Sequence, residues 1–152
     1  MAWVMGKMMQ VFRSFDHQNA AVAGWGIRVL LLGENPMEGR ALRHLASLGS
    51  LVEMTDELYT ALSAVLDDPV GYGLLVIDCD SIGGLEAGRK AVQVLNGSDC
   101  KVPVILVSAE CGEQIFPQDR RAPTMLRAPL SSVAMRVGFE HALRDRFNAR
   151  MI

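Results

Sequence analysis

Oxygen-bearing side chains follow three apolar runs of this sequence, at the positions where each run ends. Glu34 follows residues 27–32, Asp78 and Asp80 follow residues 72–77, and Ser108 follows residues 102–107. Carboxylate and hydroxyl oxygens are the ligands that a hard cation such as magnesium prefers. A carboxylate beside a bound cation can also act as a nucleophile toward phosphorus. Glu34, Asp78 and Asp80 could therefore hold magnesium weakly, and a carboxylate beside that ion could react with phosphorus.

The same side chains also have a purely structural interpretation, because strands ordinarily end in solvated turns. In that interpretation Asp78 caps a turn, Ser108 is a simple strand-end hydroxyl, and Glu34 is a solvated acid that favours the dipole of the next helix. The residues alone leave both interpretations open.

The elements that must position these side chains alternate between strands and helices. Short apolar runs bounded by turn formers predict strands over 27–32, 51–54, 72–77, 102–107 and 124–126. Apolar residues at helical spacing predict helices over 37–48, 58–65 and 85–95, and a last helix that Ser131 or Ser132 caps and that reaches residue 147. The pattern between 109 and 118 is weak and fits a helix or a loop.

This alternation is typical of an α/β domain with a parallel sheet covered by helices on both faces. In such a sheet the functional crevice lies beyond the carboxyl ends of the strands. We therefore expect Glu34, Asp78, Asp80 and Ser108 to lie at one edge of the sheet.

The composition is that of a globular domain. The chain has 152 residues, is 50% hydrophobic and carries a formal net charge of −2, which argues against nucleic-acid binding through bulk charge. No apolar run approaches the roughly 20 residues of a membrane span. The three cysteines are an odd number with no metal-ligand spacing, so reduced thiols and a cytoplasmic protein are expected.

Residues 1–26 stand outside the alternating pattern, and we treat them as an N-terminal extension of a domain over 27–152. Apolar residues within the extension fall on one helical stripe, namely Val4, Met8, Val11, Phe12 and Phe15. An amphipathic helix of this kind would dock on a partner protein or on a second copy. The alternative is a leader without structure of its own.

Four local motifs carry a family resemblance. They are VLLLGENP at 29–36, GLLVID at 73–78, VPVILVSA at 102–109 and MLRAPL at 125–130. Together with the order and spacing of the elements, they make the stretch from Ile27 to about Phe147 resemble a response-regulator receiver domain of the CheY type.

The resemblance implies a fold and a chemistry. The fold is a CheY-like, flavodoxin-like three-layer sandwich whose five parallel strands have the order 2-1-3-4-5. Asp78 would accept a phosphoryl group from a histidine kinase with the help of magnesium, and Ser108 would be the phosphoryl-sensing hydroxyl. The domain would signal through protein contacts and would not be an enzyme. The resemblance also implies a cis bond between Ala128 and Pro129.

The sequence departs from the family pattern at several site positions. The first residue of the acidic pair is Gly33, and the second is Glu34 in place of aspartate. The conserved lysine of the family falls at Ala128, while Arg127 next to it points to the other face by strand alternation. The aromatic switch position falls at Met125. We therefore expect slow phosphorylation, which Ala128→Lys together with Gly33→Asp should accelerate.

Two functions from the same signalling class remain. The first is a receiver that is phosphorylated on Asp78 and, because the chain ends soon after its last helix, acts without an output domain. The second is a pseudo-receiver, a binding or dimerisation module that works without phosphorylation. A flavodoxin-like nucleotide enzyme is disfavoured, because no glycine-rich phosphate loop follows the first strand. The N-terminal stripe with Phe139 and Phe147 predicts a homodimer.

Overall fold

The computed structural model describes residues 26–34 and 39–146 of the chain. These residues contain one five-stranded sheet, whose strands are β1 (Arg28–Leu32), β2 (Leu51–Thr55), β3 (Leu74–Asp78), β4 (Val104–Ser108) and β5 (Thr124–Arg127). All neighbouring strands are parallel, and their order is β2-β1-β3-β4-β5. The predicted fold class and strand order are confirmed.

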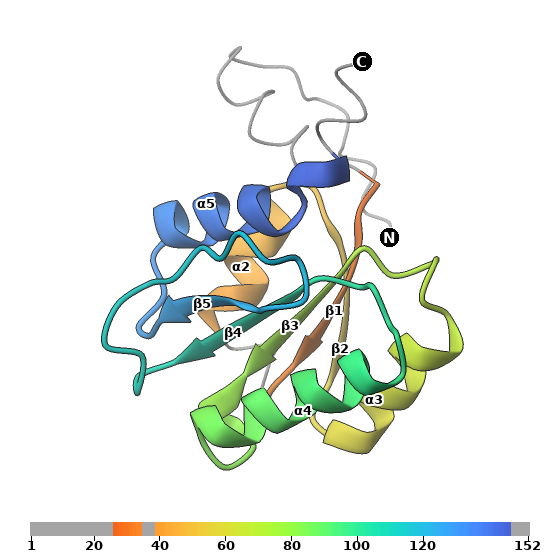
Figure 1. Ribbon diagram of the computed structural model, residues 1–152. Helices are drawn as coiled ribbons and strands as arrows, with labels where there is room; N and C mark the ends of the chain where they lie inside the picture. Colours follow the sequence, from red (N-terminus) through yellow and green to blue (C-terminus); the bar gives the residue numbers. More distant parts are fainter. Residues whose placement is uncertain (1–25, 35–38, 147–152) are drawn as a thin grey trace.

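Helices cover both faces of this sheet. The helices are α2 (Arg40–Ser47), α3 (Leu58–Asp67), α4 (Leu85–Gly97) and α5 (Ser132–Ala142), and a short 3-10 turn, η3 (Cys79–Ser81), follows β3. Figure 1 shows α2 and α5 on one face and α3 and α4 on the other. The result is the three-layer sandwich that the sequence predicts.

The sheet separates two apolar cores. Alternate residues of β1 face opposite sides, so that Leu31 packs in the core under α2 and α5 while Leu30 packs in the core under α3 and α4. Phe139 of α5 is fully buried in the first core. The homodimer prediction was therefore wrong to count Phe139 as part of an exposed apolar patch. The exposed apolar residues of α5 are Val133 and Val137.

Several element ends differ from their predicted positions for local reasons. Strand β4 begins two residues late because Pro103 has no N–H to donate to a ladder, although its carbonyl still accepts from Leu75 N at 3.0 Å. Helix α4 runs through Asn96 and Gly97, and Asp99 with φ 58° makes the left-handed turn after it. Aspartate tolerates that conformation better than most residues.

The connection between β4 and β5 contains no helix among its described residues 109–123. The weakly patterned segment after residue 108 is therefore a loop. Part of the loop returns to the sheet, where Ile115 and Met125 form an antiparallel bridge with paired N–H to carbonyl hydrogen bonds of 2.8 and 2.9 Å. Figure 1 shows this loop running alongside β5.

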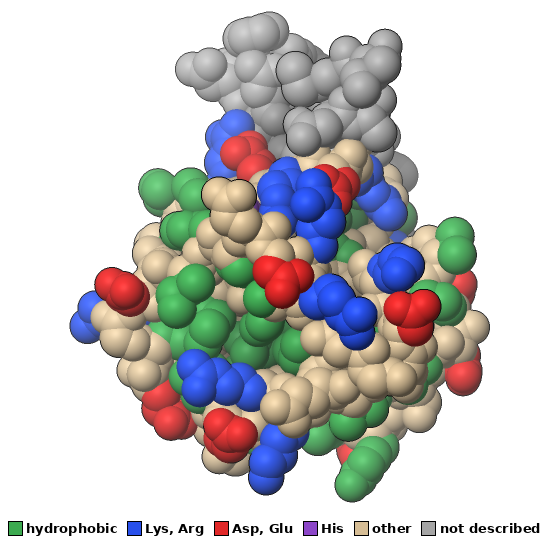
Figure 2. Space-filling model, viewed as in Figure 1, with side chains coloured by type: hydrophobic (Ala, Val, Ile, Leu, Met, Phe, Trp, Pro, Cys, Tyr) green, Lys and Arg blue, Asp and Glu red, His purple; other side chains and the backbone are tan. Residues whose placement is uncertain are grey.

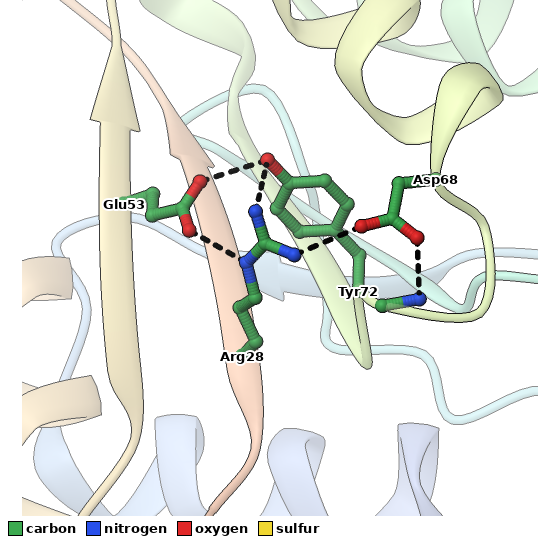
Figure 3. A network of polar contacts seen from close by, with 5 residues as sticks. Arg28, Glu53, Asp68 and Tyr72 are labelled. Atoms are coloured by element: carbon green, nitrogen blue, oxygen red, sulfur yellow. Dashed lines mark hydrogen bonds and ion pairs between the residues drawn. The ribbon is translucent and has the colours of Figure 1, made fainter.

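A polar network ties together the amino-terminal ends of the strands (Figure 3). Arg28 of β1 donates to Glu53 of β2 at 2.6 Å, to Asp68 after α3 at 3.0 Å and to Tyr72 before β3 at 3.3 Å. The tyrosine hydroxyl donates to Glu53 at 2.8 Å, and the guanidinium carbon lies 4.1 Å from the centre of the tyrosine ring. The hydrogen bond from Arg28 lowers the pKa of Glu53.

Several predictions fall outside the described residues. They concern the amphipathic stripe within residues 1–25, Asn35 and Pro36 after β1, and Phe147 at the end of the last predicted helix. Within the ranges that are described, no helix combines the length and the apolar character that crossing a membrane requires.

Candidate functional site

Asp78 is the last residue of β3, the central strand of the sheet, and its side chain is half-buried. Its Oδ2 atom accepts a hydrogen bond of 2.7 Å from the hydroxyl of Ser81, which lies one turn further on. This contact keeps the carboxylate at the carboxyl-terminal edge of the sheet. Ser81 was not singled out from the sequence, although its spacing of three residues from Asp78 is typical of a local side-chain contact.

Ser108, the last residue of β4, is fully buried and donates its hydroxyl proton to Asp80 Oδ1 at 2.6 Å. The other oxygen of Asp80 accepts from the backbone N–H of Ala109 at 2.8 Å. The serine oxygen in turn accepts from the N–H of Glu110 at 3.0 Å. Asp80 therefore accepts hydrogen bonds from both the Ser108 hydroxyl and the first backbone N–H after β4.

A second carboxylate also links the segment after β4 to the segment after β3, this time from the β4 side. Glu110, in the loop after β4, accepts a 3.0 Å hydrogen bond from the N–H of Leu85, the first residue of α4. Gly84 has a φ of 110°, which L side chains rarely adopt, and an added Cβ would lie 2.6 Å from Oε2 of Glu110. Gly84 thus admits a carboxylate of the chain at the start of α4.

Asp80 and Glu110 thus hold the loops after β3 and β4 against each other. We refer to Asp80, Ser108, Ala109, Glu110 and Leu85 as the loop clamp. A carboxylate at the N-terminus of a helix is favoured by both the free N–H groups and the helix dipole. The clamp was not predicted, because its pairs are 25 to 29 residues apart and single-residue patterns carry no such information.

The position before Glu34 is tightly packed. A Cβ added to Gly33 would lie 3.0 Å from Cβ of Asp78 and 3.5 Å from its Oδ2 atom. A larger residue at position 33 would therefore require Asp78 to shift by a few tenths of an ångström, and the acceleration expected of Gly33→Asp with Ala128→Lys stays a prediction. Glu34 itself is exposed.

The end of β5 supplies no cation to Asp78 in the described structure. Arg127 points its guanidinium to the carbonyl of Gly112 at 3.4 Å, in agreement with its predicted orientation away from the site. Ala128 donates its backbone N–H to the carbonyl of Ser108 at 3.1 Å, and the bond from Ala128 to Pro129 is cis, as the resemblance implied.

The described side chains do not converge into a metal site made of protein ligands alone. Over residues 26–34 and 39–146, no group of three or more histidine, cysteine, aspartate or glutamate side chains is placed to hold a metal ion. Both oxygens of Asp80 already accept hydrogen bonds within the loop clamp. Magnesium binding by Glu34, Asp78 and Asp80 therefore stays a prediction.

Two thiols adjoin the site but are not activated. Cys79 follows Asp78 and is fully buried, and burial raises its pKa to about 12. Burial also raises the pKa of Cys111, which lies in the loop after β4. A thiol that stays protonated near neutral pH is a poor nucleophile. The hydrogen-bonded oxygens are thus the reactive candidates at this edge.

Comparison with known proteins finds relatives by structure alone. No family model and no curated protein sequence matches the chain. Among solved structures, the receiver domain of the sensor histidine kinase PA1611 from Pseudomonas aeruginosa, with a magnesium ion coordinated in its active site cleft, superposes with a TM-score of 0.61 at 19% identity. The match covers 78% of this chain and 98% of that domain.

Two further structures show the same likeness. A response regulator receiver domain from Clostridium thermocellum has a TM-score of 0.63 at 12% identity, over 81% of this chain and 98% of that one. The receiver domain of the histidine kinase CKI1 from Arabidopsis thaliana, complexed with Mg2+ and BeF3-, has a TM-score of 0.54 at 17% identity, over 80% and 93%. The described part of this chain therefore has the CheY-like fold of receiver domains.

Proposed function

We propose that this chain is a receiver-type signalling module that acts through protein contacts, is not an enzyme, and works without phosphorylation of Asp78. The fold supports the first part, because the solved structures it resembles include receiver domains of response regulators and of histidine kinases. The loop clamp supports the last part.

The observation that carries this proposal is the engagement of Ser108 by Asp80. A serine hydroxyl has one proton to donate, and that proton is directed to Asp80 Oδ1 at 2.6 Å. The first amide after β4 is also taken by Asp80, at 2.8 Å. A phosphoryl group on Asp78 would have to displace this carboxylate before Ser108 could sense it.

The charges at the site also disfavour phosphorylation of Asp78. Two carboxylates, Asp78 and Asp80, lie within three residues at the end of β3, and Ala128 stands where the family pattern places a lysine. Transferring phosphoryl groups are stabilised by cations placed at their oxygens. The site therefore lacks one such cation.

A second candidate function is phosphoryl acceptance by Asp78 from a histidine kinase, assisted by magnesium. One observation favours it: Asp78 ends the central strand, and the contact shown for its carboxylate is a single hydrogen bond from Ser81. This candidate shares the fold and the signalling class with the first, and the two differ in whether Asp80 can leave Ser108.

Partners and location follow from the signalling class. We propose a histidine kinase or another signalling protein as the partner, and a cytoplasmic location. A homodimer is also proposed, now with Val133 and Val137 of α5 as its exposed apolar contacts, which are 70% and 45% exposed. Apolar residues on one exposed helix face are typical of protein interfaces.

Beryllofluoride, a phosphoryl mimic, separates the two candidates. We would titrate it with magnesium into the 15N-labelled chain and follow the amide signals of Ala109 and Glu110. The first proposal predicts no saturable shifts in the natural chain and saturable shifts in Asp80→Ala, where Ser108 is released. Saturable shifts in the natural chain that Asp78→Ala abolishes would establish the second candidate instead.

A further inference from the structure

A groove of about 720 Å³ lies at the amino-terminal ends of β3, β4 and β5. This is the opposite edge of the sheet from Asp78. Its floor is made of buried aliphatic side chains, which include Val92 and Leu95 of α4, Val102 just before β4, Val104 at the start of β4, and Leu143 after α5. The loop before β5 forms one wall. Pockets of this volume are of the size that accommodates small organic ligands.

The rim of this groove is strongly basic. Five cationic side chains line it, namely Lys101, Arg120, Arg121, Arg144 and Arg146, against the two carboxylates Asp99 and Asp145. Five positive and two negative charges leave a local charge of +3, whereas the whole chain carries −2. In Figure 2, Lys and Arg side chains gather across the middle and upper part of the visible face. The groove thus concentrates positive charge on a slightly acidic protein.

Part of this charge is held in place by neutral partners. Arg121 donates from Nη2 to the carbonyl of Asn96 at 2.8 Å. Arg144 donates to the carbonyls of His141 and Gln118 at 2.7 and 2.9 Å. A backbone carbonyl orients a guanidinium without neutralising its charge. These arginines therefore remain able to attract an anion.

A third arginine reaches the groove because a glycine, Gly73, directly precedes β3. An added Cβ on Gly73 would lie 3.3 Å from Nη1 of Arg146 and 2.9 Å from Cγ2 of Ile27. The absence of a side chain at this position lets the guanidinium lie directly against the start of β3. Arginines from the β4–β5 loop and from the end of the chain thus meet at one groove.

We propose that this groove binds a small polyanionic ligand with a planar apolar group, of the nucleoside polyphosphate class. Guanidinium groups form paired hydrogen bonds with phosphate oxygens and stack on planar rings, and the aliphatic floor would accept the base. The net positive rim matches the several negative charges of a polyphosphate. The proposal does not depend on the proposed function, since the groove lies at the other edge of the sheet.

The test is a calorimetric titration of the full chain with ATP in the presence of EDTA. We expect saturable binding that weakens as salt is raised, with adenosine binding more weakly because it lacks the phosphates. Arg121→Gln and Arg146→Gln should each weaken ATP binding about tenfold, the scale of one charged hydrogen bond. The matched control is Arg136→Gln, which removes an arginine of α5 that pairs with Glu140 at 3.2 Å and does not line the groove.

Three results would overturn the proposal. If titration with millimolar ATP gave no binding heat, the groove would not be a site for this class of ligand. Equal weakening by Arg136→Gln and the groove variants would show attraction by general charge alone. Tighter binding of a polyglutamate peptide than of ATP would assign the groove to an acidic protein segment. Asp78→Ala should leave ATP binding unchanged, which separates this test from that of the proposed function.

Discussion

Asp80 has a structural role in this molecule beside any role in signalling. Its carboxylate accepts the hydroxyl proton of Ser108 and the N–H of Ala109, and the serine side chain is 0% exposed. A buried donor without a partner costs free energy because water cannot reach it. Removing the carboxylate should therefore destabilise the fold.

We predict that Asp80→Ala lowers the free energy of unfolding by about 1–3 kcal/mol, the cost of leaving a buried polar group unsatisfied. Urea denaturation followed by circular dichroism measures this change. Asp80→Asn keeps one side-chain oxygen as an acceptor and should lose less. Asp56→Ala, which removes an exposed carboxylate after β2, is the matched control. A loss no larger than that of the control would mean that the clamp does not stabilise the fold.

At the scale of elements, the start of α5 depends on one of two adjacent serines. The sequence left Ser131 and Ser132 as equal candidates for the cap. The structure assigns the cap to Ser131, whose Oγ accepts from the N–H of Ala134 at 3.0 Å. Capping satisfies a donor that the helix itself leaves free.

This assignment gives a prediction with its control beside it. Ser131→Ala should cost about 1 kcal/mol of stability, the usual cost of losing an N-cap. Ser132→Ala should be nearly neutral, since this residue lies inside the helix on an exposed face. Thermal melts of the two variants would decide, and equal losses would contradict the assignment.

The polar network at the amino-terminal ends of the strands makes stability depend on pH. The hydrogen bond from Arg28 lowers the pKa of Glu53 below its ordinary value of 4.5. The unfolded chain therefore binds this proton at a higher pH than the folded chain. The stabilisation is complete above about pH 4.5 and is lost as the pH falls through the folded-state pKa.

We predict that Glu53→Gln destabilises the protein at pH 7 by roughly 0.2–1 kcal/mol, a value limited because the pair is partly exposed. The difference from the natural chain should shrink below pH 4.5, where the natural glutamate also becomes neutral. Urea denaturation at pH 7, 5 and 3.5 measures it. If the difference in the free energy of unfolding between the two chains grew toward low pH, the ionised Glu53 would not stabilise the fold.

At the scale of the whole molecule, short-range patterns predicted most of the fold. Strands and helices follow from apolar periodicity and from turn formers such as Gly49, which adopts φ 86° after α2. The loop after β4 resisted prediction because its Ile115 pairs with Met125 of a later strand. The exposure of Phe139 was predicted wrongly, because helical periodicity alone does not say which face of a helix packs against the sheet.

Some members of the candidate site were predicted from the sequence, but Ser81, Glu110 and the contacts between the members were not. Asp78, Asp80 and Ser108 lie at one edge, as parallel strands require. Which oxygen pairs with which donor depends on loop paths, so the bond from Ser108 to Asp80 could not be read from spacing. Because of that bond, Ser108 is already engaged by Asp80 and is not free to contact a phosphoryl group on Asp78.

Intact-mass spectrometry after incubation with acetyl phosphate and magnesium tests this interpretation most directly. A receiver site that lacks one stabilising cation should lose about 2.7–4 kcal/mol of transition-state stabilisation, a factor of about a hundred to a thousand in rate. With Ala128 in place of lysine and Asp80 on Ser108, we predict that the natural chain gains no phosphoryl mass within an hour-scale incubation. Rapid, magnesium-dependent addition of one phosphoryl group that Asp78→Ala abolishes would contradict the account.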